Sequence, residues 1–231
     1  IDSKEDDLPF SIVSILNFSK PLLIAIDTFC SWSARADFII SPTFYSDQIP
    51  KFVERQNFVG GREFVSIRPG ADTPLQIRAI LVTFGGSDPN NITELLLEAI
   101  TELNLQEKTN VILGPGYIGS VFSMKSRFPK VHFYWSVDAT IEFVRFANIV
   151  ITALGTTVNE IEFTKRYGFL IFNYAADELD FSYLLSSSSQ KEKWISFGVF
   201  PRFERHQFKL QMHKIFSRKR VDHSAALPSL N

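Results

Sequence analysis

The sequence has very little cysteine and no long apolar run. Cys30 is the single cysteine among 231 residues, which excludes an internal disulfide and a zinc site made of cysteines, and favours a reducing compartment. No stretch reaches the roughly 20 apolar residues that a membrane-spanning helix needs, and the first residues lack the layout of a signal peptide. We therefore expect a cytoplasmic protein without stable membrane insertion.

The sequence also lacks an excess of charge of either sign. There are 24 Lys and Arg against 25 Asp and Glu, and the formal net charge of -1 gives no whole-chain argument for a nucleic-acid partner. The segment 204–231 is basic, and its apolar residues Phe208, Met212, Ile215 and Phe216 follow a helical spacing. We expect a C-terminal helix with a solvated basic face there. No metal-ligand spacing occurs, so neither a metal nor a cofactor is expected.

Short apolar runs that end at turn residues are abundant instead. Their length and their lack of clean alternation are typical of strands buried on both faces of a parallel sheet. The runs that fit this pattern are 21–29, 36–44, 78–86, 109–116, 130–137, 147–155 and 167–175.

Helical patterns lie between several of these runs. The clearest begins near Asn91, where apolar residues from Ile92 to Leu103 form one continuous stripe. Asn90 or Asn91 can cap this helix, and Glu94 stands where the acid of a capping box would. Alternating strands and helices predict an α/β fold with right-handed crossovers.

The spacing of the runs suggests three parts. Five runs predict one complete, doubly wound, Rossmann-like domain at 71–203. The upstream runs predict part of a second such domain at 1–70, with a glycine- and proline-rich connection at 58–76. The basic tail at 204–231 is the third part.

Two strand-to-helix turns are candidates for chemistry, because ligands of a doubly wound sheet bind beyond the carboxyl ends of its strands. The first turn holds Gly85, Gly86 and Ser87, followed by Asp88. The third glycine of a dinucleotide motif is missing, so a nicotinamide site is not expected. A tight turn alone also requires glycine, so these residues fit either a ligand site or a simple turn.

The second turn holds Gly155, Thr156 and Thr157, and Glu160 follows in the first turn of the next helix. Threonine hydroxyls and helix N-terminal amides suit a phosphate, and a carboxylate one turn further on suits the hydroxyls of a ribose. The alternative is a threonine cap with Glu160 complementing the helix dipole.

These motifs resemble a known family. The segments LVTFGGSDPNNIT, VILGPG and FANIVITALGTTVNE are similar to the C-terminal half of the hydrolases that release UDP from a 2,4-diacetamido-trideoxy-altrose in pseudaminic acid synthesis, and to related spore-coat polysaccharide proteins. The resemblance covers most of residues 20–200. It implies a GT-B fold, shared with glycosyltransferases, and a chain that is N-terminally incomplete relative to the family.

The resemblance also implies roles for individual residues. Gly85, Gly86 and Ser87 would line the diphosphate side of the cleft, with Asp88 shaping the loop. Gly155, Thr156 and Thr157 would bind the diphosphate, and Glu160 the ribose. The loop around Val137 and Asp138 would hold the uracil.

One part of the family pattern is missing. The Gly-x-Gly-His-x-x-Arg element, whose histidine is thought to serve in the hydrolysis, does not occur here, so no catalytic residue is assigned. Three readings stay open: a UDP-sugar hydrolase that needs further residues, a glycosyltransferase with a UDP-sugar donor, and a non-catalytic nucleotide-binding remnant. The expected partner in each is a small nucleotide or nucleotide-sugar, and the oligomeric state is left open.

Overall fold

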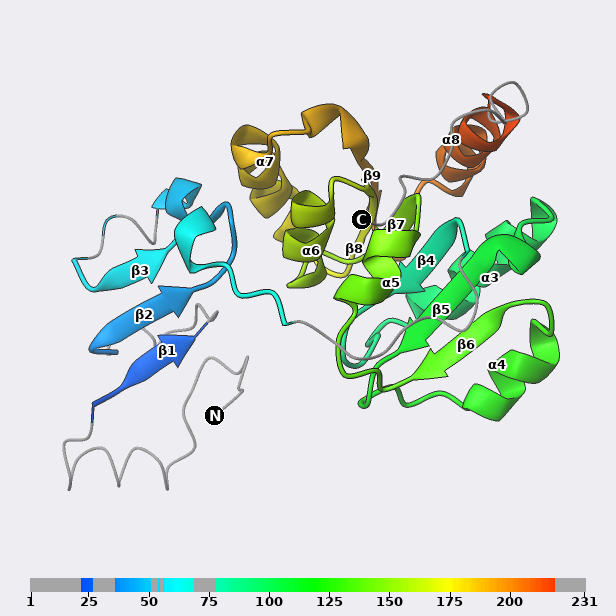
Figure 1. Cartoon of the computed structure of the whole chain (residues 1–231), viewed down its shortest axis with the longest axis horizontal. Helices are drawn as coiled ribbons and strands as arrows, with labels where there is room; N and C mark the ends of the chain where they lie inside the picture. The colour runs from blue at the N-terminus through cyan, green and yellow to red at the C-terminus, as the bar shows by residue number, and fades with distance from the viewer. Residues whose placement is uncertain (1–21, 27–35, 51–53, 55, 69–77, 219–231) are drawn as a thin grey trace, which may run out of the picture. The chain divides into compact units, whose positions relative to one another are not determined.

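The computed structural model describes residues 22–26, 36–50, 54, 56–68 and 78–218 (Figure 1). Cys30 and His223 lie outside these residues, as do residues 69–76 of the predicted connection and the end of the basic tail. The chain divides into two compact units, 1–68 with 179–191 and 69–178 with 192–231. The domain bounds inferred from the sequence stay a prediction.

The first unit contains a parallel sheet of three strands in the order β1-β2-β3. β1 (Ile24–Ile26) and β2 (Phe38–Ser41) confirm the first two predicted strands. β3 (Phe58–Gly60) lies where the sequence predicted a connection, and that prediction is wrong for these three residues. The strand is short, it ends at Gly60, and Gly61 follows it in the left-handed region (φ 97°). Two adjacent glycines are typical of a turn, which is why the sequence pattern indicated a connection here. Two 3₁₀ turns also belong to this unit, Ser46–Gln48 and Arg62–Phe64.

The second unit contains a sheet of six parallel strands, which confirms the predicted α/β class. All five strands predicted here are present. The strands are β4 (Ile80–Thr83), β5 (Thr109–Leu113), β6 (His132–Trp135), β7 (Ile149–Thr152), β8 (Tyr167–Phe172) and β9 (Trp194–Val199). The helices are α3 (Ile92–Glu102), α4 (Val121–Arg127), α5 (Ile141–Phe146), α6 (Thr157–Thr164), α7 (Asp177–Ser187), which continues into the first unit, and α8 (Arg205–Arg218). Two further 3₁₀ turns span Gln106–Lys108 and Lys191–Lys193.

The sequence did not predict β9. Its residues, WISFGV, include Ser196 and a glycine at 198 with a left-handed φ of 83°, and both weaken a strand pattern. The pairing of β9 with β8 also changes register between Leu170 and Phe172. A continuous apolar run is therefore absent from a strand that tertiary pairing nevertheless forms.

The strand order of this sheet is β6-β5-β4-β7-β8-β9. Counted from the first strand of the unit, the order is 3-2-1-4-5-6, which is that of a Rossmann-like, doubly wound domain. The direction of winding reverses between β4 and β7. Since all six strands are parallel, the loops after β4 and β7 leave the sheet side by side at its carboxyl edge.

The sheet is covered on both faces (Figure 1). β4, β5 and β7 are buried at every position, as expected for parallel strands between two helical layers. α3, α4 and α8 contribute Leu96, Met124, Phe208 and other side chains to one core with alternate strand residues. α5 and α6 lie over the opposite face (Figure 1), where Phe143 of α5 packs edge-on against Tyr134 of β6.

α8 is held to the body of the second unit by buried apolar side chains. Phe208 and Met212 are fully buried, and the ring of Phe208 lies 5.4 Å from that of Phe197 in β9. Around this contact, Arg205 and Lys209 form ion pairs with Glu102 of α3. Burial of the aromatic ring is the larger contribution, because partly exposed ion pairs stabilise by about 1 kcal/mol or less.

Replacing Phe208 with alanine is expected to lower the free energy of unfolding by about 3–5 kcal/mol, because it leaves a cavity under α8. The matched control is Leu210→Ala on the same helix, where the side chain is 51% exposed and a change within about 0.5 kcal/mol is expected. Urea denaturation followed by circular dichroism measures both. Equal stability of the two variants would show that α8 is not docked through Phe208.

Candidate functional site at the carboxyl edge of the sheet

The turn after β4 places its two glycines in different circumstances. Gly85 has a φ of 74°, which favours glycine, while Gly86 has no such conformation. The carbonyl of Gly86 accepts a hydrogen bond from the amide of Gly116, which follows β5 (2.8 Å). A Cβ atom at Gly114 would lie 2.3 Å from the carbonyl oxygen of Gly85, so this position must be glycine for the two loops to meet.

The N-terminus of α3 is capped by its own chain. The two carboxylate oxygens of Asp88 accept hydrogen bonds from the amides of Ile92 (2.9 Å) and Thr93 (3.0 Å), and the Asp88 side chain is buried. The prediction that Asn90 or Asn91 caps this helix is wrong. Asn91 occupies the N-cap position but is left-handed and makes no capping bond, and its side-chain amide donates to Glu94 instead. An anion is therefore excluded from these two amides, because a carboxylate already occupies them.

At the turn after β7, no side chain of the described residues bonds the amides at the start of the helix that follows, α6. Thr156 makes no side-chain capping bond, and among the described residues neither its amide nor that of Thr157 has an acceptor. Gly155 and Thr156 are exposed. A Cβ atom at Gly155 would meet nothing within 4 Å, and its φ is not left-handed, so neither packing nor conformation requires glycine there. The helix that follows offers free N–H groups beside an open surface, which is the arrangement that binds anions.

Glu160 lies on α6 one turn beyond this opening. Its Oε2 accepts a hydrogen bond from the hydroxyl of Thr140, which ends the loop after β6. Burial raises the pKa of the Glu160 carboxyl above its usual range, and the bond from Thr140 acts in the opposite direction. Within the described residues Oε1 has no partner, so one oxygen of a half-buried carboxylate can accept a hydrogen bond from a ligand.

The loop after β6 holds the residues predicted to lie near a base. Ser136 begins it in the left-handed region (φ 48°), and its amide donates to the carbonyl of Leu113 (2.9 Å). Asp138 is exposed and Val137 is half-buried. The bond from Thr140 to Glu160 connects this loop to α6, the helix that follows β7, and no spacing in the sequence could reveal this contact.

A further contact connects the loop after β4 to the loop after β8. The side-chain amide of Asn90 donates to Oδ1 of Asn173 (3.1 Å), and the amides of Asn173 and Tyr174 donate to Asp177. The structure thus brings the loops after β4 and β8 into direct contact, and likewise the loop after β6 and helix α6. The predicted residues all lie on loops or a helix start at one edge of the sheet.

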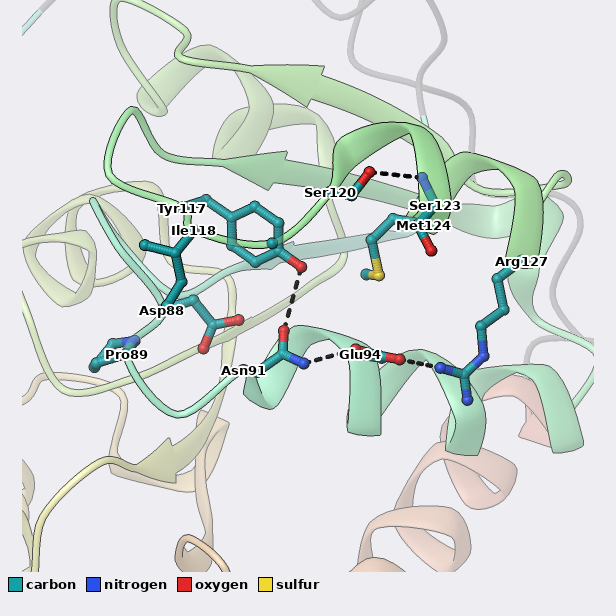
Figure 2. A pocket seen from close by; sticks show the side chains of 11 residues that line it. Asp88, Pro89, Asn91, Glu94, Tyr117, Ile118, Ser120, Ser123, Met124 and Arg127 are labelled. Carbon is teal, nitrogen blue, oxygen red and sulfur yellow. Dashed lines mark hydrogen bonds and ion pairs between the residues drawn. The ribbon is translucent and has the colours of Figure 1, made fainter.

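A separate hollow of about 350 Å³ lies between the starts of α3 and α4 (Figure 2). Its polar groups are bonded to one another: the hydroxyl of Tyr117 donates to Asn91, which donates to Glu94, and Glu94 pairs with Arg127. Burial and the nearby charges of Asp88 and Glu94 raise the pKa of Tyr117. Asp88 is the single residue of the predicted site that lines this hollow.

Catalytic groups are not evident in the part of the chain that the structure describes. His132 begins β6 at the amino edge of the sheet, opposite the two turns, and burial lowers its pKa. His206 and His213 are exposed on α8. Within residues 22–26, 36–50, 54, 56–68 and 78–218, no three His, Cys, Asp or Glu side chains are placed to hold a metal ion. No helix found over the same ranges is long and apolar enough to span a membrane.

Comparisons with known proteins give limited similarity. No protein-family model matches the chain. An uncharacterized protein of Methanocaldococcus jannaschii, MJ1062, is 30% identical over 93 residues, which are 38% of this chain and 19% of that protein. Among solved structures, the spinosyn forosaminyltransferase SpnP superposes with a TM-score of 0.45 at 15% identity, over 83% of this chain and 49% of SpnP. The chain therefore spans less than half the length of each, and a TM-score of this size carries no argument about the GT-B arrangement.

The two glycines at 114 and 155 are expected to respond differently to alanine. Gly114→Ala places a methyl group against the backbone of the turn after β4, and should lower the free energy of unfolding by about 1–3 kcal/mol. Gly155→Ala meets open space and should leave stability within about 0.5 kcal/mol of the parent. Thermal unfolding measures both. A loss of stability at Gly155→Ala as large as that at Gly114→Ala would show that glycine 155 serves the fold.

The raised pKa of Glu160 predicts a pH-dependent gain in stability for Glu160→Gln. The folded chain holds the Glu160 proton to a higher pH than the unfolded chain does, so ionisation costs stability as pH rises above the usual glutamate value. The variant should therefore be more stable than the parent near pH 7.5, with the difference vanishing below about pH 4. Thermal unfolding across this range is the measurement. A parent that is the more stable of the two at neutral pH would contradict it.

Proposed function

We propose that the chain binds the UDP part of a UDP-sugar at the carboxyl edge of the six-stranded sheet. The observation that carries this proposal is the open N-terminus of α6, where the amides of Thr156 and Thr157 have no acceptor within the described residues. This helix start lies at the reversal point between β4 and β7, where doubly wound sheets bind their ligands.

Each part of the ligand has a proposed partner. The diphosphate binds the amides and hydroxyls of Thr156 and Thr157. Gly155 permits its close approach because it has no side chain and the space where a Cβ atom would stand has no neighbour within 4 Å. Gly85, Gly86 and Ser87 line the neighbouring side. Asp88 does not bind the ligand in this proposal, since its carboxylate already accepts hydrogen bonds from the first amides of α3 and would repel a phosphate.

The nucleoside extends from the diphosphate toward the loop after β6. Glu160 accepts the ribose hydroxyls through its unpartnered oxygen, and the backbone around Val137 and Asp138 holds the uracil. The contact between Thr140 and Glu160 supports this direction, because it joins the ribose partner to the loop assigned to the base.

The proposed reaction class is hydrolysis of the bond between the sugar and UDP, as in the family of surface-polysaccharide enzymes that the sequence resembles. The amides at α6 would stabilise the leaving diphosphate without a metal ion. The base that activates water lies outside the groups assigned here. Transfer of the sugar to an acceptor is the alternative reaction on the same GT-B framework, and nucleotide binding without catalysis is the alternative that needs no further residue.

Calorimetric titration with UDP tests the binding proposal. The chain is expected to bind UDP saturably, and Glu160→Ala to weaken binding by about tenfold or more, because a hydrogen bond to a charged group is lost. CMP, with one phosphate fewer and a different base, should bind much more weakly.

The control variant is Glu107→Ala, an exposed residue just before β5 at the amino edge of the sheet. It should bind UDP like the parent. Absence of UDP binding by a chain that circular dichroism shows to be folded would refute the proposed function.

A further inference from the structure

Thr140 occupies the N-cap position of α5 but does not cap that helix. Threonine at this position ordinarily accepts a hydrogen bond from an amide of its own helix. Here no such side-chain bond is present, and the backbone of Thr140 is itself helical (φ -82°, ψ -20°). The hydroxyl donates instead to the carboxylate of Glu160, 20 residues further along the chain. The Thr140 side chain therefore makes no capping bond to α5 and instead donates a hydrogen bond to a residue of α6.

This bond settles which atom of Glu160 remains available. An ionised carboxylate only accepts hydrogen bonds, so the hydroxyl proton of Thr140 must point to Oε2. The other oxygen, Oε1, has no partner among the described residues. The side chain is half-buried, so its rotation is restricted by packing as well as by this bond.

We propose that Thr140 is a positioning residue that fixes the Glu160 carboxylate for the 2′-hydroxyl of ribose, and so makes the site select ribonucleotides over deoxyribonucleotides. This inference rests on the proposed function, since it names how that same site recognises its sugar. Thr140 itself does not touch the ligand. It acts by hydrogen-bonding Oε2 of Glu160, which keeps Oε1 in a fixed position where it can accept the 2′-hydroxyl.

The physical basis is that an acceptor held in place discriminates more strongly than one that rotates. A site arranged to receive a hydroxyl rejects an analogue without it, because a desolvated acceptor is then left unpaired. A carboxylate that is not held can turn toward water when the hydroxyl is missing, and the penalty disappears. Loss of Thr140 should therefore reduce the preference for ribose more than it reduces binding as a whole.

The experiment compares UDP with 2′-deoxy-UDP by calorimetry in the parent chain, Thr140→Val and Thr140→Ser. Valine keeps the shape of threonine without the donor, and serine keeps the donor. The parent should prefer UDP by about tenfold or more. Thr140→Val should weaken UDP binding by about three- to tenfold and leave 2′-deoxy-UDP binding unchanged, so that the preference shrinks. Thr140→Ser should restore the preference.

Non-additivity provides an independent check. Since Thr140 is proposed to act through Glu160, the double variant Thr140→Val/Glu160→Ala should bind UDP no more weakly than Glu160→Ala alone. If Thr140→Val does not fold, as judged by thermal unfolding, Thr140→Ala takes its place in both comparisons.

The outcomes separate the two proposals. If the parent does not bind UDP, the proposed function fails and this inference fails with it. If the parent binds UDP but Thr140→Val keeps the same preference for ribose, nucleotide binding stands and the role of Thr140 is overturned. An equal loss of UDP and 2′-deoxy-UDP affinity in Thr140→Val also overturns it, because it shows a purely structural effect.

Discussion

The parallel pairing of β4 with β7 is the constraint on which the candidate site depends. These strands are distant in sequence but adjacent in the sheet, with Ile80 opposite Ile149 and Val82 opposite Ile151. Each is buried along its whole length, so a shift of register would expose apolar side chains or bury the loops. Because both strands point the same way, their turns emerge together at one edge. This carboxyl edge is where doubly wound sheets bind their ligands.

Two helix starts at this edge look alike in sequence, but they differ in whether their first amides already have a hydrogen-bond acceptor. α3 begins with its amides bonded to the buried carboxylate of Asp88, whereas α6 begins with amides that have no acceptor in the described part of the chain. A helix N-terminus attracts anions only while its N–H groups are available. The chain thus satisfies the first of these two helix starts with its own carboxylate, and the second is the one at which we propose that a ligand binds.

Much of this could be predicted from the sequence, and the reasons are local. Buried parallel strands carry apolar runs bounded by turn residues, so all seven predicted strands were confirmed. β9 and β3 were missed because glycines or polar residues interrupt them or follow them directly, and their pairing is set by neighbours rather than by their own pattern. The cap of α3 was misassigned because Asp88, which has a left-handed backbone, reaches the helix amides from two residues before Asn90 and three before Asn91.

The functional detail was less predictable for a related reason. Glycines 85, 86, 114 and 155 look equivalent in sequence, and only the surrounding atoms show that Gly114 is required by a close backbone contact while Gly155 is not. The bond from Thr140, at the end of the loop after β6, to Glu160 on α6 joins residues 20 positions apart and has no sequence signature. Such contacts depend on tertiary geometry, which no local pattern encodes.

The most direct test of this account is to follow the backbone amides by ¹⁵N nuclear magnetic resonance as UDP is added. The amides of Thr156 and Thr157 should shift with saturation, together with those of Gly86 and Ser87. The amides of Ile92 and Thr93 should shift little, because Asp88 holds them in the free and the bound chain alike. Shifts confined to α3 and the hollow beside it, with Thr156 and Thr157 unmoved, would contradict the account.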